Sequence, residues 1–221
     1  MPFVLRPPIR KARFSIALGV SALALIAFPA FASAADCADE PSSQIFSIYG
    51  DDENYSLVPG GDFDYSTPGW IFKRAKPDSM DSLKRKNAPH LSRDRDAKSL
   101  RMDPQSYAVS PPVCVSIRHP SFRLFAFKKG GGWGDLNVRL LYQTSDGDYS
   151  IIPVGSLDGE DYRSWSLSPS LPLWSALPLA EDETAQVRLV FDYGFLPTGD
   201  PEPGVKNQWR IDEIYVDPYR R

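Results

Sequence analysis

Histidine and cysteine are scarce in this chain of 221 residues, which holds two of each. It contains no Gly-x-Ser-x-Gly elbow and no His-Glu-x-x-His helix, the patterns that mark a serine nucleophile or a catalytic zinc. His119 could orient a serine or bind a metal, but a histidine directly before Pro120 is more typical of a turn. A pair among the 28 acidic residues could still serve a glycosidase. Because the other catalytic patterns are absent, we predict a protein that is not an enzyme.

Long apolar runs are absent except near the N-terminus, where residues 14–31 follow four basic residues and precede Ala32-Ser33-Ala34. This order of basic, apolar and small residues is typical of a cleaved secretory signal peptide. An uncleaved membrane anchor is the alternative, and Pro29 argues against it. The sequence therefore predicts a signal peptide over residues 1–34 and one secreted, extracellular domain over residues 35–221.

Basic residues are fewer than acidic ones: the chain has 25 Lys and Arg and 28 Asp and Glu, which gives a formal net charge of −3. Four of those basic residues belong to the predicted signal peptide, so the remainder is more acidic still. A chain of this charge is a poor match for nucleic acid or an anionic membrane. We expect a soluble monomer that binds neither.

The two cysteines, Cys37 and Cys114, are too far apart for a CxxC redox pair and too few for a zinc cluster. An even pair in a secreted chain indicates a disulfide, and two separate buried thiols are the alternative. A Cys37–Cys114 bond would tie the start of the domain to the strand expected over residues 113–117.

Helical periodicity is weak after residue 34, and 21 prolines leave little room for long helices. Short alternating runs recur between turn signals instead. Residues 136–143 and 149–152 alternate on either side of Asp146-Gly147, which predicts a β-hairpin. Together these runs predict an all-β fold, an antiparallel β-sandwich of the jelly-roll type.

The stretch from Lys76 to Lys98 is rich in both charges and nearly free of apolar residues. This composition predicts an exposed loop between strands. A basic patch for an acidic polymer is the sharper alternative, although interleaved acids and surface screening weaken it. The same loop could instead serve a structural or protein-interaction role at the cell surface.

The last predicted strand, residues 209–218, places an acid on an apolar face. By simple alternation Asp212 lies on the same face as Ile214 and Val216, unless a bulge intervenes near Glu213. A buried carboxylate needs an arginine or a cation as partner. Gly60-Gly61-Asp62-Phe63-Asp64 is a turn that could supply carbonyl and carboxylate oxygens, the ligands that Ca²⁺ prefers.

Two segments resemble carbohydrate-binding modules with a galactose-binding-like jelly roll. Gly60-Gly61-Asp62-Phe63-Asp64, followed by Trp70, is similar to their opening strand, and residues 209–216 are similar to their closing strand. The extra Asp62 and the Glu213 after Asp212 depart from the usual motifs. The resemblance implies a structural Ca²⁺ held by Asp64 and Asp212. From Cys37 to Arg221 the layout also resembles a group of uncharacterised secreted actinobacterial proteins, which implies no particular function.

A carbohydrate site needs an aromatic platform beside polar side chains. Trp133 follows three glycines and is expected to be exposed, and Trp165 lies near Tyr162. Packing in the core is the alternative for each tryptophan. We therefore predict a secreted, non-enzymatic module that binds carbohydrate or cell-envelope glycan through Trp133, Trp165 and Tyr162, with an extracellular hydrolase as the weakest alternative.

Overall fold

The alternating runs of the sequence form strands, as predicted. The computed structural model describes residues 41–79, 98–116, 121–130, 134–144, 146–173, 177, 185–194 and 207–217. In these ranges the elements, in chain order, are β1 (Ser42–Ser43), the 3-10 helix η1 (Ser47–Tyr49), β2 (Tyr55–Leu57), β3 (Ile71–Ser79), β4 (Lys98–Val109), β5 (Val113–Val115), β6 (Ser121–Lys129), β7 (Leu136–Gln143), β8 (Tyr149–Leu157), β9 (Ser166–Leu167), β10 (Leu171–Pro172), β11 (Ala185–Tyr193) and β12 (Gln208–Asp217).

All the pairs formed by these strands are antiparallel. The hairpin predicted around Asp146-Gly147 is confirmed: β7 pairs with β8 from Leu136↔Leu157 to Gln143↔Tyr149. Gly147 has a φ of 87° at its tip, a conformation that glycine adopts without steric cost.

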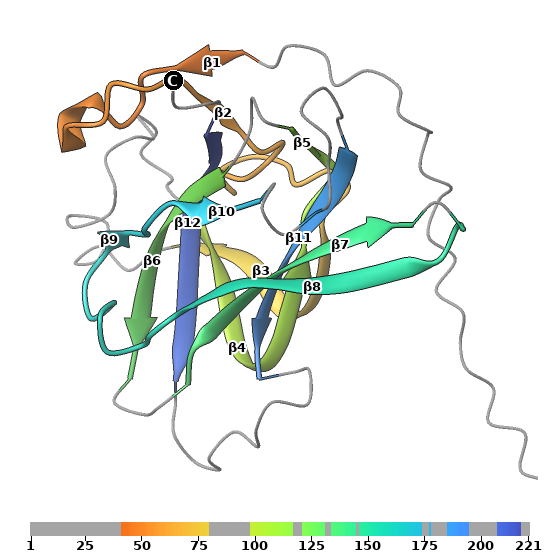
Figure 1. Cartoon of the computed structure of the whole chain (residues 1–221). Coiled ribbons are helices and arrows are strands. Elements are labelled where there is room, and N and C mark those ends of the chain that lie inside the picture. The colour runs from red at the N-terminus through yellow and green to blue at the C-terminus, as the bar shows by residue number, and fades with distance from the viewer. Residues whose placement is uncertain are drawn as a thin grey trace, which may run out of the picture. The chain divides into compact units, whose positions relative to one another are not determined.

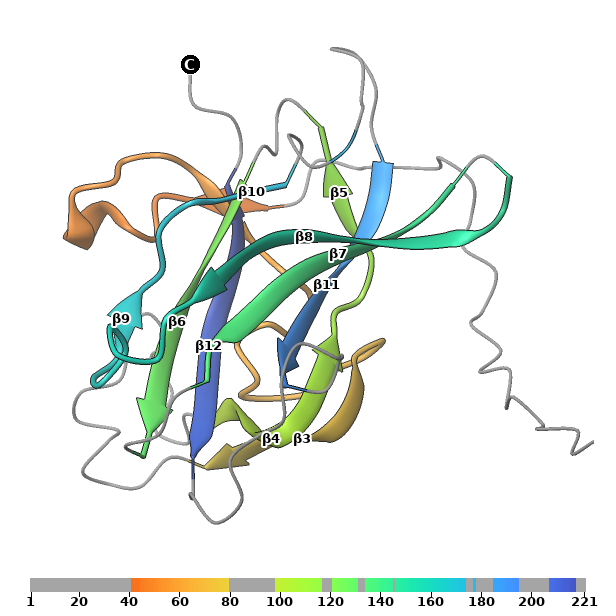
Figure 2. The same cartoon turned by 60° about the horizontal axis from the view of Figure 1, so that its bottom comes forward.

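The strand β4 joins two layers of sheet. Its first half pairs with β12 and its second half with β11. Between the halves, Pro104 and Gln105, whose φ is 62°, bend the strand. Such a bend lets one strand take part in both layers of a sandwich. Figures 1 and 2 show β6 and β12 side by side, with the β7–β8 hairpin crossing them.

The main core lies between the two layers. Trp209 and Ile211 of β12 and Leu124 of β6 belong to the same buried cluster as Leu140 of β7 and Leu189 of β11. Both layers therefore turn one apolar face inward. The described part of the chain is an antiparallel β-sandwich of the jelly-roll type, as the sequence predicts.

A second, smaller cluster covers part of the opposite side of the β6–β12 layer. The N-terminal segment brings Phe46 and Tyr55 onto Phe125 and Tyr215, and the Phe46 and Tyr55 rings meet edge to face at 4.6 Å. Arg123 of β6 forms an ion pair with Asp51 at 3.2 Å beside this cluster. The N-terminal segment thus packs against one part of this side of the β6–β12 layer and does not cover the part around Phe127 and Arg210.

The expected loop from Lys76 to Lys98 is shorter than predicted. β3 continues to Ser79 and β4 begins at Lys98, because Lys76 and Asp78 pair with Arg101 and Ser99 across the two strands. Residues 80–97 lie outside the described part of the chain, as does the role proposed for them.

Cys114 lies on β5, half-buried, and is not a free thiol. Cys37 lies outside the described residues, so the Cys37–Cys114 pairing stays a prediction. Residues 34–221 make one compact unit, and the predicted boundary after residue 34 also falls outside the described ranges. No helix in those ranges is long and apolar enough to cross a membrane.

Candidate functional site

The candidate site is the side of the β9–β6–β12–β4–β3 layer that faces away from the main core, called here the outer face. Strand register sets its pattern. Leu100, Met102, Trp209 and Ile211 point into the core, so the alternate residues Arg101 and Arg210 and their neighbours belong to the outer face. The face therefore gathers polar side chains from strands that are distant in the sequence.

A bulge in β12 divides the outer face. The pairing register between β12 and β6 changes between Asp212 and Tyr215, and Glu213 has a φ of 51°. The bulge reverses the alternation, so Ile214 points into the main core while Asp212 points to the outer face. Simple alternation, which put Asp212 on the same face as Ile214 and Val216, is wrong; the bulge that the sequence left open is present.

The Gly60–Asp64 turn packs directly on this bulge. The Ile214 amide donates to the Gly61 carbonyl at 3.2 Å, and the Val58 amide donates to the Ile214 carbonyl at 2.9 Å. Phe63 has a φ of 52° and fills the core with a fully buried ring. The two segments that carry the sequence resemblance therefore lie against each other.

This contact buries a cluster of acids. Asp212, Glu213 and Asp64 are 4%, 2% and 8% exposed. The Asp212 carboxylate accepts a hydrogen bond from the Glu213 amide at 2.9 Å, and the Asp64 carboxylate accepts one from the Lys98 amide at 2.7 Å. Both of these donors are neutral amides, and the Lys98 ammonium donates to the Asp64 backbone carbonyl at 3.2 Å. The cluster thus concentrates negative charge in a place with little water to screen it.

The electrostatics of the cluster are unfavourable for charged Asp212. Burial raises its pKa well above the usual range, and the neighbouring Glu213, Asp64 and Asp62 raise it further. Burial, followed by the charge of Asp64, also raises the pKa of Asp62. Arg210, two residues before Asp212, bonds to Asp78 instead.

Of the two residues predicted to hold calcium, Asp64 is therefore close enough to Asp212 to raise the pKa of Asp212. No group of three or more His, Cys, Asp or Glu side chains in the described ranges is arranged as a metal site. The calcium prediction remains untested.

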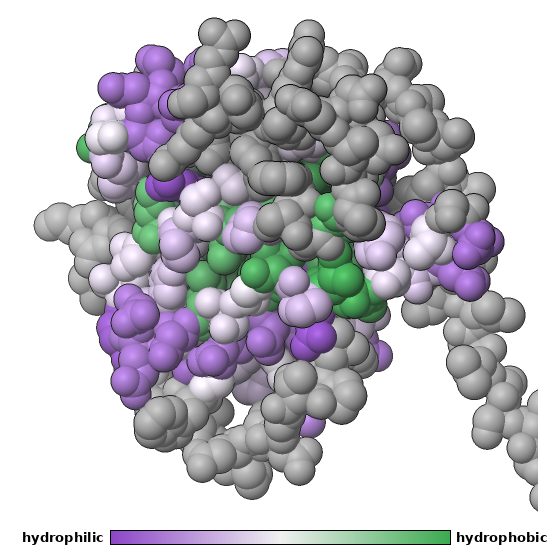
Figure 3. All heavy atoms as spheres, in the orientation of Figure 1, coloured by the Kyte–Doolittle hydropathy of each residue, from purple (hydrophilic) through white to green (hydrophobic). Residues whose placement is uncertain are grey.

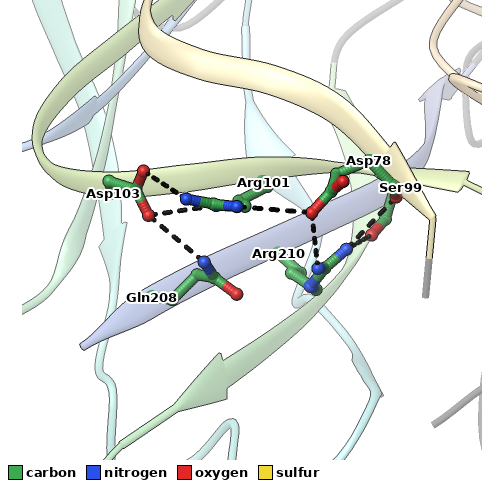
Figure 4. A network of polar contacts seen from close by, with 6 residues as sticks. All are labelled: Asp78, Ser99, Arg101, Asp103, Gln208 and Arg210. Atoms are coloured by element: carbon green, nitrogen blue, oxygen red, sulfur yellow. Dashed lines mark hydrogen bonds and ion pairs between the residues drawn. The ribbon is translucent and has the colours of Figure 1, made fainter. Parts of the chain in front are cut away.

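An arginine–aspartate network occupies the next part of the outer face (Figure 4). Arg101 donates to Asp103 through two bonds of 3.1 and 2.9 Å. Its guanidinium also lies 3.5 Å from Asp78, which in turn pairs with Arg210 at 3.1 Å. Figure 4 shows Asp78 between the two arginines. The network holds both guanidinium groups in fixed positions.

Arg210 is the buried member of the network and Arg101 the accessible one. Arg210 also donates to Ser99 Oγ at 3.0 Å, and its side chain is only 8% exposed, compared with 32% for Arg101. Although burial opposes it, hydrogen bonding from Arg101 and Gln208 lowers the pKa of Asp103. Asp103 is therefore ionised at neutral pH and serves to orient Arg101.

An aromatic pair adjoins this network. Phe127 lies opposite Arg210 in the β6–β12 register, and the Trp165 ring packs on Phe127 with centroids 5.9 Å apart. Both rings are half-buried. The Trp165 indole nitrogen is itself buried, with no hydrogen-bond partner within the described part of the chain, so the pair offers ring surface rather than a free indole N–H. The outer face thus presents aromatic surface beside polar groups, as a carbohydrate site requires.

The three predicted ligand-binding residues have different positions. Trp165 is on the outer face. Tyr162 is buried in the main core, with its ring 5.7 Å from that of Trp209. Trp133 lies outside the described residues. Sequence reasoning missed Phe127, whose only signal is that the residues of β6 are apolar on both faces.

The opposite layer offers a second exposed apolar surface. Figure 3 shows hydrophobic side chains at the surface, between hydrophilic ones, where Figure 1 draws β8. Tyr149 and Ile151 of β8 are 41% and 47% exposed. β8 ends the principal strand order of the sheet, and Pro153 within it is typical of an edge strand that resists further pairing.

Comparisons with known proteins give only remote likenesses. No protein-family model matches the chain, and no curated protein matches it. Among solved structures, it is similar to the CBM22-1 and GH10 modules of Clostridium thermocellum xylanase 10B, complexed with xylohexaose, at 9% identity and TM-score 0.40, covering 75% of this chain and 29% of that one.

Two further likenesses are to separate modules. The CBM22-1 xylan-binding domain of Paenibacillus barcinonensis Xyn10C is 11% identical, with a TM-score of 0.41, over 73% of this chain and 93% of that one. CBM28, a carbohydrate-binding module specific for non-crystalline cellulose, is 9% identical, with a TM-score of 0.44, over 73% of this chain and 95% of that one. At such TM-scores these likenesses carry no argument, and the function must be inferred from the chain's own residues.

Proposed function

We propose that this chain is a secreted, non-enzymatic module that binds carbohydrate across its outer face. The observation that carries the proposal is the half-exposed Phe127–Trp165 pair beside the fixed Arg101 guanidinium. Aromatic rings pack against the apolar faces of sugar rings, while arginine and amide groups donate to the hydroxyls. Gln208, held at 3.2 Å from Asp103, supplies such an amide.

The polar groups of the outer face are arranged for binding rather than for hydrolysis. A glycosidase needs one accessible carboxyl with a raised pKa to act as general acid. Asp103 has a lowered pKa, and Asp78 is shared by two arginines. Asp212 has a raised pKa but is 4% exposed beneath the Gly60–Asp64 turn. The half-buried Asp62 also has a raised pKa, so the support for the non-enzymatic part of the proposal comes from Asp103, Asp78 and Asp212.

We also propose that a structural Ca²⁺ is held at the acid cluster by Asp64 and Asp212. The support is the close packing of acids whose negative charges repel one another, together with carbonyl oxygens from the Gly60–Asp64 turn. Calcium would neutralise the cluster and fix the turn against the β12 bulge. The alternative to a cation is that Asp212 carries a proton at neutral pH.

The test of function is binding of the purified protein to an array of neutral and charged plant and cell-envelope glycans. Binding should be lost in a Phe127→Ala/Trp165→Ala variant and kept in Tyr149→Ala, an aromatic truncation on the other layer. Trp133→Ala tests the remaining predicted residue. Absence of binding to every glycan at millimolar concentration would overturn the proposal and favour a structural or protein-interaction role.

A further inference from the structure

A row of residues crosses the outer face from an aromatic side chain to three cations. Register places Phe127 opposite Arg210, Arg210 opposite Arg101, and Arg101 opposite Lys76. Neighbouring strands lie about 4.8 Å apart, so the row spans roughly 14 Å. That length suits several consecutive units of a polymer rather than one small molecule.

A bulge in β3 adds further positive charge to the row. Arg74 has a φ of 51°, and the pairing with β4 shifts register between Lys73 and Ala75. As a result Arg74 and Lys76 are both exposed at the edge of the outer face, and the exposed Lys73 lies opposite Tyr107, just beyond the bend of β4. Arg74 is close enough to the outer face to lower the pKa of Asp103, after the larger effects of Arg101 and Gln208. A positive φ is unfavourable for arginine, so the bulge keeps these cations together at a conformational cost.

The cations of β3 are not neutralised by the acids of the face. Asp78 and Asp103 pair with Arg101 and Arg210. Within the described ranges, the side chains of Lys73, Arg74 and Lys76 form no ion pair. The β3 edge of the outer face thus carries local positive charge, whereas the acid cluster lies at the β12 bulge, on a chain whose formal net charge is −3.

We infer that the outer face binds an acidic polysaccharide whose sugar units carry carboxylates, an inference that rests on the proposed carbohydrate function. Phe127 and Trp165 pack against a sugar ring, and the fixed Arg101 with the exposed β3 cations receives the carboxylates of neighbouring units. Arginine held by aspartates keeps its geometry, which lowers the entropy lost on binding. A nucleic acid is another polyanion that the rest of this acidic chain would repel, and the test below separates it from an acidic polysaccharide.

The test compares polymers that differ only in charge. Binding of the purified protein is measured by calorimetry to polygalacturonate and to its fully methyl-esterified form, with alginate, hyaluronan and a single-stranded DNA oligonucleotide as further probes. At least one of the three acidic glycans should bind, and polygalacturonate should bind better than its ester. A Lys73→Gln/Arg74→Gln/Lys76→Gln variant should weaken binding to the acidic glycan roughly tenfold. The matched Lys73→Arg/Lys76→Arg variant, which keeps all three positive charges, should bind as the parent does.

The outcomes separate this inference from the function on which it rests. Binding to neutral glycans alone, unaffected by the glutamine variant, would overturn the acidic specificity and leave carbohydrate binding intact. Binding to none of the glycans would overturn both. DNA binding as tight as that of the acidic glycans, or acidic binding that persists at about 1 M salt, where the Debye length is about 3 Å, would also overturn it.

Discussion

The replacement Asp212→Asn tests the physical account of the buried acid cluster. Asparagine keeps an oxygen that can accept the Glu213 amide hydrogen bond of 2.9 Å, but it removes the charge that burial and the neighbouring acids disfavour. The change therefore alters electrostatics while preserving shape. Its effect on stability should have opposite signs with and without calcium.

Without a cation, the raised pKa of Asp212 means that the folded state binds a proton more tightly than the unfolded state. The resulting stabilisation is complete below pH 3.8, the ordinary value, and is lost as the pH rises through the raised folded value. At pH 7 in EDTA we expect Asp212→Asn to be more stable than the parent. An uncompensated buried charge costs about 3 to 5 kcal/mol, which corresponds to roughly 6 to 20 °C in Tm.

With calcium the order should reverse. The parent gains about 2.7 kcal/mol when free calcium is 100 times the Kd, whereas Asp212→Asn lacks a charged ligand and should respond weakly. Thermal unfolding followed by circular dichroism, with EDTA or calcium and from pH 5 to 8, measures both effects. A variant less stable than the parent in EDTA at pH 7 would refute the electrostatic reasoning, and a parent indifferent to calcium would refute the cation site.

Three further predictions concern stability. Gly61→Ala should lower the free energy of unfolding by about 1 to 3 kcal/mol, because its Cβ would lie 2.9 Å from the Val58 carbonyl oxygen and 3.2 Å from that of Ile214. A Cβ at Gly50 would meet no atom within 4 Å, so Gly50→Ala should lower it by about 1 kcal/mol. Arg210→Gln should cost about 2 to 3 kcal/mol by urea unfolding, and Arg101→Gln, being more exposed, less than about 1 kcal/mol. Thiol titration of the denatured, unreduced protein should find no free cysteine, and Cys114→Ser should cost about 2 to 5 kcal/mol.

Each of these predictions can fail clearly. Equal losses of stability in Gly61→Ala and Gly50→Ala would show that the Gly60–Asp64 turn is not closely packed against the β12 bulge. Equal losses for the two arginine variants would show that burial of Arg210 does not set its contribution. Two titratable thiols would exclude the predicted disulfide.

The strands could be predicted because their signals are local. Alternation in β7 and β8 and the Asp146-Gly147 turn fix the hairpin within some twenty residues of sequence. The β12 bulge could be named only as a possibility, because neither Asp212 nor Glu213 has the backbone freedom that marks such sites. Its presence shows only in the three-dimensional packing of Ile214 against the Gly60–Asp64 turn.

The outer-face row could not be predicted, because it depends on register between distant strands. Phe127 meets Arg210, and Arg210 meets Arg101, only after β6, β12 and β4 have paired. A one-residue slip would turn each of these side chains to the other face. The sequence indicated Trp165 by its residue type, but the polar groups beside it come from the fold.

The most direct test of carbohydrate binding on the outer face is an NMR titration that follows the indole N–H of Trp165 as glycan is added. This group is buried without a hydrogen-bond partner within the described residues, and its ring packs on Phe127, so a sugar that stacks on the ring pair should shift its resonance. We expect a saturable shift that disappears in Phe127→Ala. If a glycan binds and the Trp165 resonance stays unchanged, the binding face lies elsewhere and the account is wrong.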